Sequence, residues 1–186
     1  MLSTTDAIVL SLQPHSDKAH ILHAYTRAGG RVNYKVYGLG KKNSAEKYSP
    51  LSIVQLTTDE RSIRTAQLTY IPATLTTNPY KRTIALFLGE VLYHVLRHPM
   101  PDEPMYDFLE QAIQALDATD EPQNFHLQFL ISFAAKLGFA MEKEMAQPYS
   151  RAERQEALQA LCAYFAEHVE TWQNPRSLDV LMEVFD

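Results

Sequence analysis

The sequence predicts an α+β protein in which a small N-terminal β-barrel precedes an all-helical module. Up to Pro72, apolar residues recur at every second position in five short runs that turn-forming residues separate. After Pro72 the apolar spacing changes to three or four residues, which is typical of amphipathic helices. Five short strands in roughly seventy residues leave no room for a second sheet, so we expect one closed or nearly closed barrel. We place the domain boundary between residues 76 and 77.

The predicted strands are bounded by turn signals. Pro14, within the polar run 13–17, is expected to end the first strand, and Ala28-Gly29-Gly30 is expected to form a tight turn because glycine tolerates positive φ. Ile8, Leu10 and Leu12 share one face of the first strand. The five strands are predicted over residues 6–12, 19–26, 31–37, 51–57 and 63–71.

Residues that typically begin or end helices recur in the second half of the chain. Asn78 can cap a helix that begins at Pro79, and Ser150 with Glu153 fits a capping box. Gly138 is expected just beyond the end of an almost wholly apolar helix, which we place at the centre of a bundle. The predicted helices cover residues 79–98, 105–116, 124–137, a segment that begins after Ser150, and a short one that begins at 174–175.

Composition narrows the class of protein. The chain has 186 residues, an apolar content of 46% and a charged content of 21%, as in globular proteins. It has no apolar run of the roughly 18 to 20 residues that span a bilayer, and residues 1–10 lack the features of a secretory signal. Its single cysteine, Cys162, excludes an internal disulfide and is expected in the core of a cytosolic protein.

Charge is distributed unevenly along the chain. The net charge is -5, yet residues 1–78 hold nine Lys and Arg against five acids, and the remainder holds eight against seventeen. The stretch 26–47 alone has six cations and one acid, Glu46. A basic first module and an acidic second module indicate different partners.

The predicted strand at 31–37 has one apolar and one polar face. Val32, Tyr34 and Val36 alternate with cations and an aromatic residue on the other side. Cations that bind phosphates and an aromatic ring that stacks on bases suit single-stranded nucleic acid, although such a strand can equally be an ordinary solvated face. The candidate nucleic-acid contacts of this stretch are Arg27, Arg31, Lys35, Tyr37, Lys41, Lys42 and Lys47.

The sequence lacks the motifs that would indicate a catalytic or nucleotide-binding site. It contains no GxxxxGK[ST] and no GxGxxG motif. Glu90, His94 and His98 could form one edge of a metal site, but surface or boundary histidines explain them as well. We therefore expect no enzymatic activity, no cofactor and no metal. A metal-dependent nuclease or phosphoesterase that uses the histidines of residues 15–23 is the weaker alternative.

Motifs along most of the chain resemble those of the RecO family of bacterial DNA repair and recombination mediators. The matching positions are residues 7–10, 16–17, 26, 30–31, 38 and 41–42, then 78–81 with 84–88, 124–127 through 136–139, and 177–181. The last of these is similar to the Bacteroidetes-type branch of the family.

The resemblance implies an OB-fold over residues 1–76, a helical domain over residues 77–186, and a function without catalysis. Members bind single- and double-stranded DNA, anneal strands, and work with RecR to load RecA onto strands coated by single-strand binding protein (SSB). Such a protein is expected in the cytoplasm, associated with the nucleoid and not with a membrane. Arg31, Lys41 and Lys42 match the basic strand and loop of the family. Candidates for docking the SSB C-terminal tail are Lys81, Arg82, Arg97 and Lys136.

The chain departs from the family pattern at two points. Many members carry a four-cysteine zinc module, which a chain with one cysteine cannot form. Members are also longer between the positions that match Phe139 and Ser150. The alternative function is a protein-interaction scaffold whose OB-like barrel has no direct nucleic-acid role.

Overall fold

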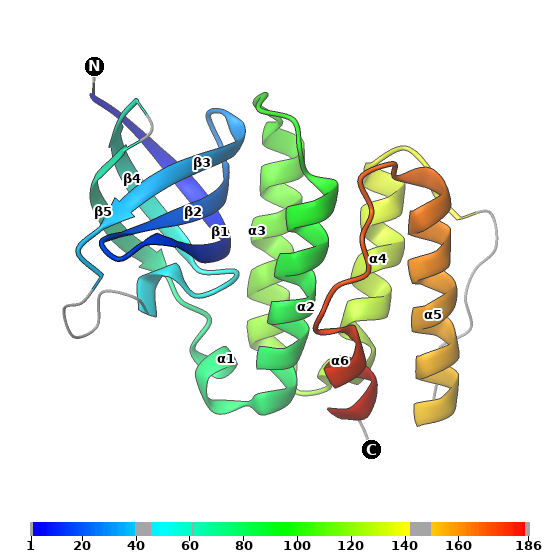
Figure 1. Ribbon diagram of the computed structural model, residues 1–186. Coiled ribbons are helices and arrows are strands. Elements are labelled where there is room, and N and C mark those ends of the chain that lie inside the picture. Colours follow the sequence, from blue (N-terminus) through cyan, green and yellow to red (C-terminus); the bar gives the residue numbers. More distant parts are fainter. Residues whose placement is uncertain (1, 40–45, 61, 142–149, 185–186) are drawn as a thin grey trace. The chain divides into compact units, whose positions relative to one another are not determined.

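The computed structural model describes residues 2–39, 46–60, 62–141 and 150–184, and these form two compact units. The first unit contains residues 1–73 and 96–114, and the second contains residues 74–95 and 115–186. The strands lie in the first unit, and the second is helical (Figure 1). The domain boundary predicted between residues 76 and 77 separates parts that are expected to fold independently. Division by contacts does not test independent folding, so this boundary stays a prediction.

The first unit is a closed five-stranded barrel with the strand order β1-β2-β3-β5-β4. All neighbours are antiparallel except β3 and β5, which pair in parallel where Lys35 lies opposite Ser62. A five-stranded Greek-key barrel of this kind is the OB-fold, so the predicted fold class is confirmed. The strands are β1 (Leu2–Ser16), β2 (Ala19–Thr26), β3 (Gly30–Tyr37), β4 (Ile53–Asp59) and β5 (Ser62–Tyr70).

The strand break predicted at residues 13–17 is wrong, because β1 continues to Ser16. Pro14 lies within the strand opposite His20, next to a register shift between Pro14 and Ser16. Proline is tolerated in a sheet at such an irregularity because no ladder hydrogen bond from its nitrogen is needed there.

The alternation predicted for β3 is confirmed from Asn33 onwards, whereas Arg31, expected on the exposed polar face, is buried. Tyr34 and Val36 are buried in the barrel core, whereas Asn33, Lys35 and Tyr37 are exposed. The barrel core consists of Ala7, Val9, Leu22, Ala24, Tyr34, Val36, Tyr48, Val54 and Leu56. Ile8 and Leu10 are also buried but lie outside this cluster, so both faces of the middle of β1 are covered.

Helix α3 (Glu103–Ala118) contributes its residues up to 114 to the first unit. It buries Met105, Tyr106, Leu109 and Ile113, which follow helical spacing on one face. The segment 96–102 that precedes α3 belongs to the same unit and runs without helix or strand structure.

The second unit contains α2 (Pro79–Val95), α4 (Phe125–Lys136), α5 (Arg151–His168) and α6 (Leu178–Val184). The short α1 (Ala73–Thr77) and the 3-10 turn Pro122–Asn124 were not predicted, and α6 begins later than the predicted terminal helix. α4 contacts both α2 and α5, as expected for a central helix. Among the described residues, no helix combines the length and the apolar character that a membrane span requires.

The predicted helix ends are confirmed where the sequence carried a cap. Asn78 Oδ1 accepts hydrogen bonds from the backbone N–H groups of Tyr80 and Lys81 at the start of α2. Ser150 and Glu153 form a complete capping box. Gly138, with φ of 92°, follows the C-cap of α4 and takes a conformation that other residues adopt only at a cost. Cys162 is buried as predicted, and burial raises the pKa of its thiol to about 11.

Candidate nucleic-acid interface

The outer face of β2 and β3 presents an exposed aromatic side chain next to lysines. Tyr37, at the end of β3, is 60% exposed, and Lys35 is exposed two residues before it. Tyr37 pairs with Ala19 of β2, which places it at the β1–β2 turn, where Lys18 is exposed. Lys35 pairs with Ser62 at the start of β5. We call Lys18, Lys35 and Tyr37 together the Tyr37 surface.

The Tyr37 surface lies where OB-folds commonly bind their ligands. The face of strands 2 and 3, together with the loops between strands 1 and 2 and between strands 4 and 5, is where OB-folds bind oligonucleotides. A phenol ring can stack on any base, and ammonium groups attract phosphates without reading sequence. The Tyr37 surface therefore has the groups that a sequence-tolerant single-strand site needs.

Arg31, at the opposite end of β3, is buried. Only 8% of the residue is exposed. Its Nη1 donates to the backbone oxygen of Leu96 at 3.4 Å, and its Nη2 lies 3.2 Å from Nδ1 of His23. Burial lowers the pKa of His23, and the nearby charge of Arg31 lowers it further, although a hydrogen bond to Asn33 opposes them. Arg31 thus joins β3 to the segment that follows α2.

Arg27 is engaged by carboxylates of α3. Its Nη1 lies 2.6 Å from Asp107 Oδ1 and 3.4 Å from Glu103 Oε1, and its Nη2 lies 3.0 Å from Glu110 Oε2. The guanidinium also sits 4.2 Å from the ring centroid of Tyr106. The hydrogen bond to Asp107 is the main reason that the pKa of Arg27 is raised above its usual value. Arg27 therefore connects the β2–β3 turn to α3.

Lys47 contacts a backbone oxygen and an aromatic ring of the barrel unit. It lies in the 3-10 turn Glu46–Tyr48, and its Nζ donates to the backbone oxygen of Ala66 in β5 at 3.4 Å. The same ammonium lies 5.2 Å from the ring centroid of Tyr48. Lys41 and Lys42 lie outside the described residues.

The structure thus brings together two of the seven predicted contacts, Lys35 and Tyr37, and adds Lys18. Lys18 was missed because it lies outside residues 26–47, the stretch whose cations were counted. Its sequence signal was its position in a turn after a polar run. Arg27, Arg31 and Lys47 have partners within the barrel unit.

The cations suggested for the SSB tail do not share one environment. Lys81 is buried, and its Nζ donates to Asp117 O at 2.7 Å and to Thr74 Oγ1 at 3.1 Å. Arg82 and Lys136 are exposed on α2 and α4 of the helical unit, whereas Arg97 is exposed in the barrel unit. Lys81 therefore has the environment of a structural residue and not that of a docking residue.

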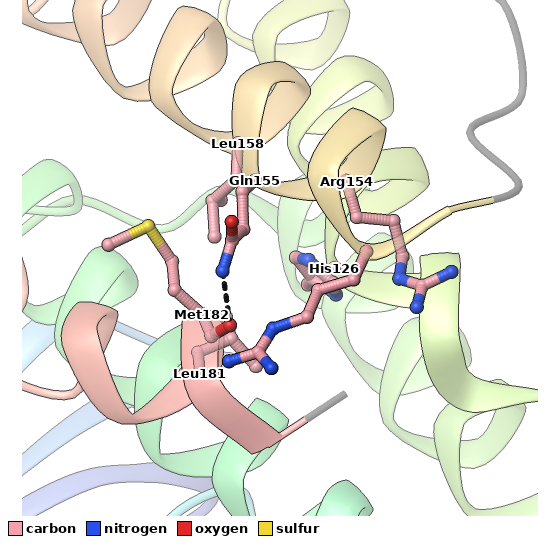
Figure 2. Close-up of a pocket in the computed structure, with 7 residues that line it drawn as sticks. His126, Arg154, Gln155, Leu158, Leu181 and Met182 are labelled. Carbon is pink, nitrogen blue, oxygen red and sulfur yellow. Dashed lines mark hydrogen bonds between the residues drawn. The ribbon is translucent and has the colours of Figure 1, made fainter. Parts of the chain in front are cut away.

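A pocket with a different pair of cations lies among α4, α5 and α6 (Figure 2). Gln155 Nε2 donates to Met182 O at 2.8 Å across it. His126 is buried beneath, and burial, together with the charge of Arg154, lowers its pKa to about 3. The lining residues are His126, Arg151, Arg154, Gln155, Leu158, Leu181 and Met182. The spacing of Arg151 and Arg154, three residues apart on one helix face, was the missed signal.

The histidines do not form a metal centre within the described part of the chain. No group of three or more His, Cys, Asp or Glu side chains is close enough there to hold an ion. Glu90, the acid of the considered metal edge, instead accepts a hydrogen bond from the backbone N–H of Ser177 at 3.2 Å.

Comparison with known proteins identifies the family. Residues 1–74 match the family model "Recombination protein O N terminal", and residues 77–144 match "Recombination protein O C terminal". The chain belongs to the RecO family. The RecO resemblance seen in the sequence motifs is thereby confirmed.

Three relatives named DNA repair protein RecO show how much of the family's length this chain spans. It is 37% identical to the protein of Phocaeicola vulgatus over 148 residues and 33% identical to that of Porphyromonas gingivalis over 150 residues. Each match covers 74% of this chain and 61% of the relative, so the chain spans about three fifths of their length. The match to the Christiangramia forsetii protein covers all of both chains at 27% identity over 238 residues.

Proposed function

We propose that this RecO protein is a DNA repair and recombination mediator that binds single- and double-stranded DNA and anneals complementary strands. Its homologues support a role in DNA repair and recombination. The observation that carries the proposal is the exposed Tyr37 ring on the β2–β3 face of an OB-fold, with Lys35 two residues before it on the strand and Lys18 exposed in the adjoining β1–β2 turn. In the cell it would act at the nucleoid and, together with RecR, help to load RecA onto SSB-coated strands.

The proposed mechanism needs no chemical step. Lysines of the Tyr37 surface neutralise phosphates and release counterions, which lowers the repulsion between two strands that approach each other. Tyr37 holds an unpaired base by stacking until it meets its complement. Arg27 and Arg31 do not contact DNA in this mechanism but fix α3 and the segment 96–102 against the barrel.

We place the SSB tail in the α4–α5–α6 pocket. The guanidinium groups of Arg151 and Arg154, which line it, suit acidic residues and a terminal carboxylate. This choice replaces Lys81, because its ammonium is used inside the unit.

One observation favours the alternative of a protein-interaction scaffold. Arg27 and Arg31, two of the predicted DNA contacts, have partners inside the barrel unit, which reduces the positive charge available to a polyanion. The alternative predicts that a labelled single-stranded oligonucleotide does not bind at either low or moderate salt.

Strand annealing in the presence of SSB tests the proposed function. The wild type is expected to accelerate annealing of SSB-coated complementary oligonucleotides, and Tyr37→Ala is expected to slow it. Arg64→Gln is the matched control, because Arg64 is an exposed barrel cation already paired with Asp59 at 2.9 Å. Equal annealing with and without the protein would contradict the proposal.

A further inference from the structure

Helix α6 forms one wall of the α4–α5–α6 pocket. Leu181 and Met182 line the pocket from α6 and face side chains of α5 (Figure 2). Gln155 Nε2 donates to Met182 O at 2.8 Å, and Gln159 Nε2 lies 3.9 Å from Met182 Sδ. Gln155, Leu158 and Gln159 share one face of α5, because they are three and four residues apart. α6 therefore covers the face of α5 that carries Leu158.

The pocket is small while α6 is docked. Its free volume is about 10 Å³, which is at most the space of one water molecule. Leu158 is 1% exposed and Leu181 is 2% exposed, so the apolar walls are closed to solvent. Arg151 and Arg154 are only half-buried, and the Arg154 side chain is directed away from Met182 (Figure 2). A partner's carboxylate can thus reach the arginines, whereas a partner's apolar side chain has no space beside them.

α6 is lightly packed against the helical unit. It has seven residues, and Leu181 is the only one of them that is buried. Asp179, Val180 and Glu183 are exposed. A helix of this length is not stable by itself in water, so its docking depends on Leu181 and on a few hydrogen bonds. Elements with so little buried apolar surface are those that open locally while the rest of a protein stays folded.

The segment 169–177, which leads to α6, is attached to α2 by its own contacts. The backbone N–H of Ser177 donates to Glu90 Oε2 at 3.2 Å, and Ser177 is buried. Thr171 Oγ1 donates to His94 O at 2.7 Å. Neither contact involves a residue of α6. α6 can therefore leave the pocket while the segment before it stays attached.

We propose that α6 is an intramolecular competitor for the acidic, apolar tail placed in this pocket, and that the apolar end of the tail enters only when α6 is displaced. This inference rests on the proposed placement of the tail. Arg151 and Arg154 receive carboxylates of the tail, and its apolar end then takes the place of Leu181 and Met182 over Leu158. The apparent affinity of the tail is its intrinsic affinity reduced by the fraction of molecules in which α6 is open.

The effect of loosening α6 on peptide affinity tests the competition. A fluorescent peptide with an acidic, apolar C-terminus is titrated with the full chain, and binding is followed by anisotropy. Leu181→Ala removes the one buried side chain of α6, so we expect it to bind the peptide about three- to tenfold more tightly than the wild type. Met182→Ala should have the same effect to a smaller extent. Val180→Ala is the matched control and should bind like the wild type, because Val180 is 52% exposed and does not line the pocket.

Amide hydrogen exchange of the wild type tests the displacement of α6 directly. Bound peptide should make the amides of residues 178–184 exchange faster, because a displaced helix loses its hydrogen bonds. The amides of α2 serve as the internal reference and should exchange as they do in the free protein. If α6 were instead a wall of the binding site, the peptide would cover it and its amides would exchange more slowly.

The possible outcomes separate the competition from the proposed placement of the tail. Weaker peptide binding by Leu181→Ala, with slower exchange of α6 in the complex, would overturn the competition and leave the tail in the pocket. Equal affinity of the wild type, Leu181→Ala and Met182→Ala would overturn it as well. If none of these proteins bound the peptide, the placement of the tail would fail too, whereas DNA binding by the barrel would be unaffected. Urea denaturation checks folding, and if Leu181→Ala does not fold, Met182→Ala decides the direction of the effect.

Discussion

The guanidinium of Arg27 donates to the carboxylate of Asp107 over 2.6 Å while lying 4.2 Å from the ring centroid of Tyr106. Asp107 is eighty residues away in sequence. The pair holds the β2–β3 turn to α3, and Arg31 joins β3 to the segment just before that helix. Two cations that look like DNA contacts in the sequence thus position α3 and the segment 96–102.

Replacing Arg27 tests this positioning role. Arg27→Gln leaves three clustered carboxylates without their counter-charge and removes the contact with Tyr106, so we expect the free energy of unfolding to fall by about 1 to 2 kcal/mol. Urea denaturation measures this. Arg64→Gln, which breaks a more exposed pair with Asp59, should cost less than about 1 kcal/mol. If Arg27→Gln instead flattened the salt dependence of DNA binding and left stability intact, Arg27 would be a DNA contact.

Gly30 and Gly38 offer a matched pair of substitutions. Both have positive φ, 62° and 74°, so alanine is strained at either position by about 1 to 2 kcal/mol. At Gly30 a Cβ would in addition lie 2.1 Å from Met100 O, whereas at Gly38 it meets nothing within 4 Å. We expect Gly30→Ala to destabilise the protein by about 2 kcal/mol more than Gly38→Ala in urea. Equal effects would mean that the segment 96–102 does not lie against the hairpin.

His126 gives the helical unit a pH dependence. Its ring stays neutral in the folded protein because burial lowers its pKa to about 3, whereas the unfolded chain binds a proton below about 6.5. Stability should therefore be complete above pH 6.5 and fall as the pH drops towards 3, by at most about 1.4 kcal/mol per unit. Between pH 7.5 and pH 5 we expect a loss of about 2 kcal/mol from this group. His126→Leu should reduce the loss, and an unchanged pH profile would contradict the burial of a neutral ring.

The α4–α5–α6 pocket makes a specific demand on the SSB tail. The substitution Arg154→Glu should weaken the binding of a fluorescent peptide with an acidic, apolar C-terminus at least tenfold. The reason is that an attraction between the guanidinium and the peptide's carboxylates becomes a repulsion. Lys136→Glu, a reversal at an exposed cation on α4, should leave the affinity within about twofold. Peptide affinity is measured by fluorescence anisotropy. A larger loss of affinity in the Lys136 variant than in the Arg154 variant would indicate that the tail binds near a cation suggested by the sequence.

Local signals in the sequence predicted much of the fold. The alternation in β3, the capping box at Ser150 and the glycine after α4 depend on neighbours within a few residues, so the pattern was sufficient. Pro14 was misread because its place beside a register shift depends on how β1 pairs with β2. A single-strand pattern contains no information about that pairing.

The site was harder to predict, because it depends on tertiary contacts. Nothing near Arg27 in the sequence indicates that Asp107 neutralises it, and nothing near Arg31 indicates that Leu96 accepts its hydrogen bond. The pocket of Arg154 likewise combines residues from three helices. At Lys35 and Tyr37 alternation alone decides exposure, so the pattern predicted that both are exposed, while their contact with DNA stays a prediction.

The central claim is that the barrel holds DNA through the Tyr37 surface, and the salt dependence of oligonucleotide binding tests it most directly. If about five phosphates are contacted, the wild type should show a log–log slope of roughly -3 to -4 on a single strand. The double substitution Lys18→Gln and Lys35→Gln should reduce the magnitude of that slope by about 1.4, and Tyr37→Ala should weaken binding at least fivefold with the slope unchanged. Wild-type slope and affinity in all of these variants would contradict the claim.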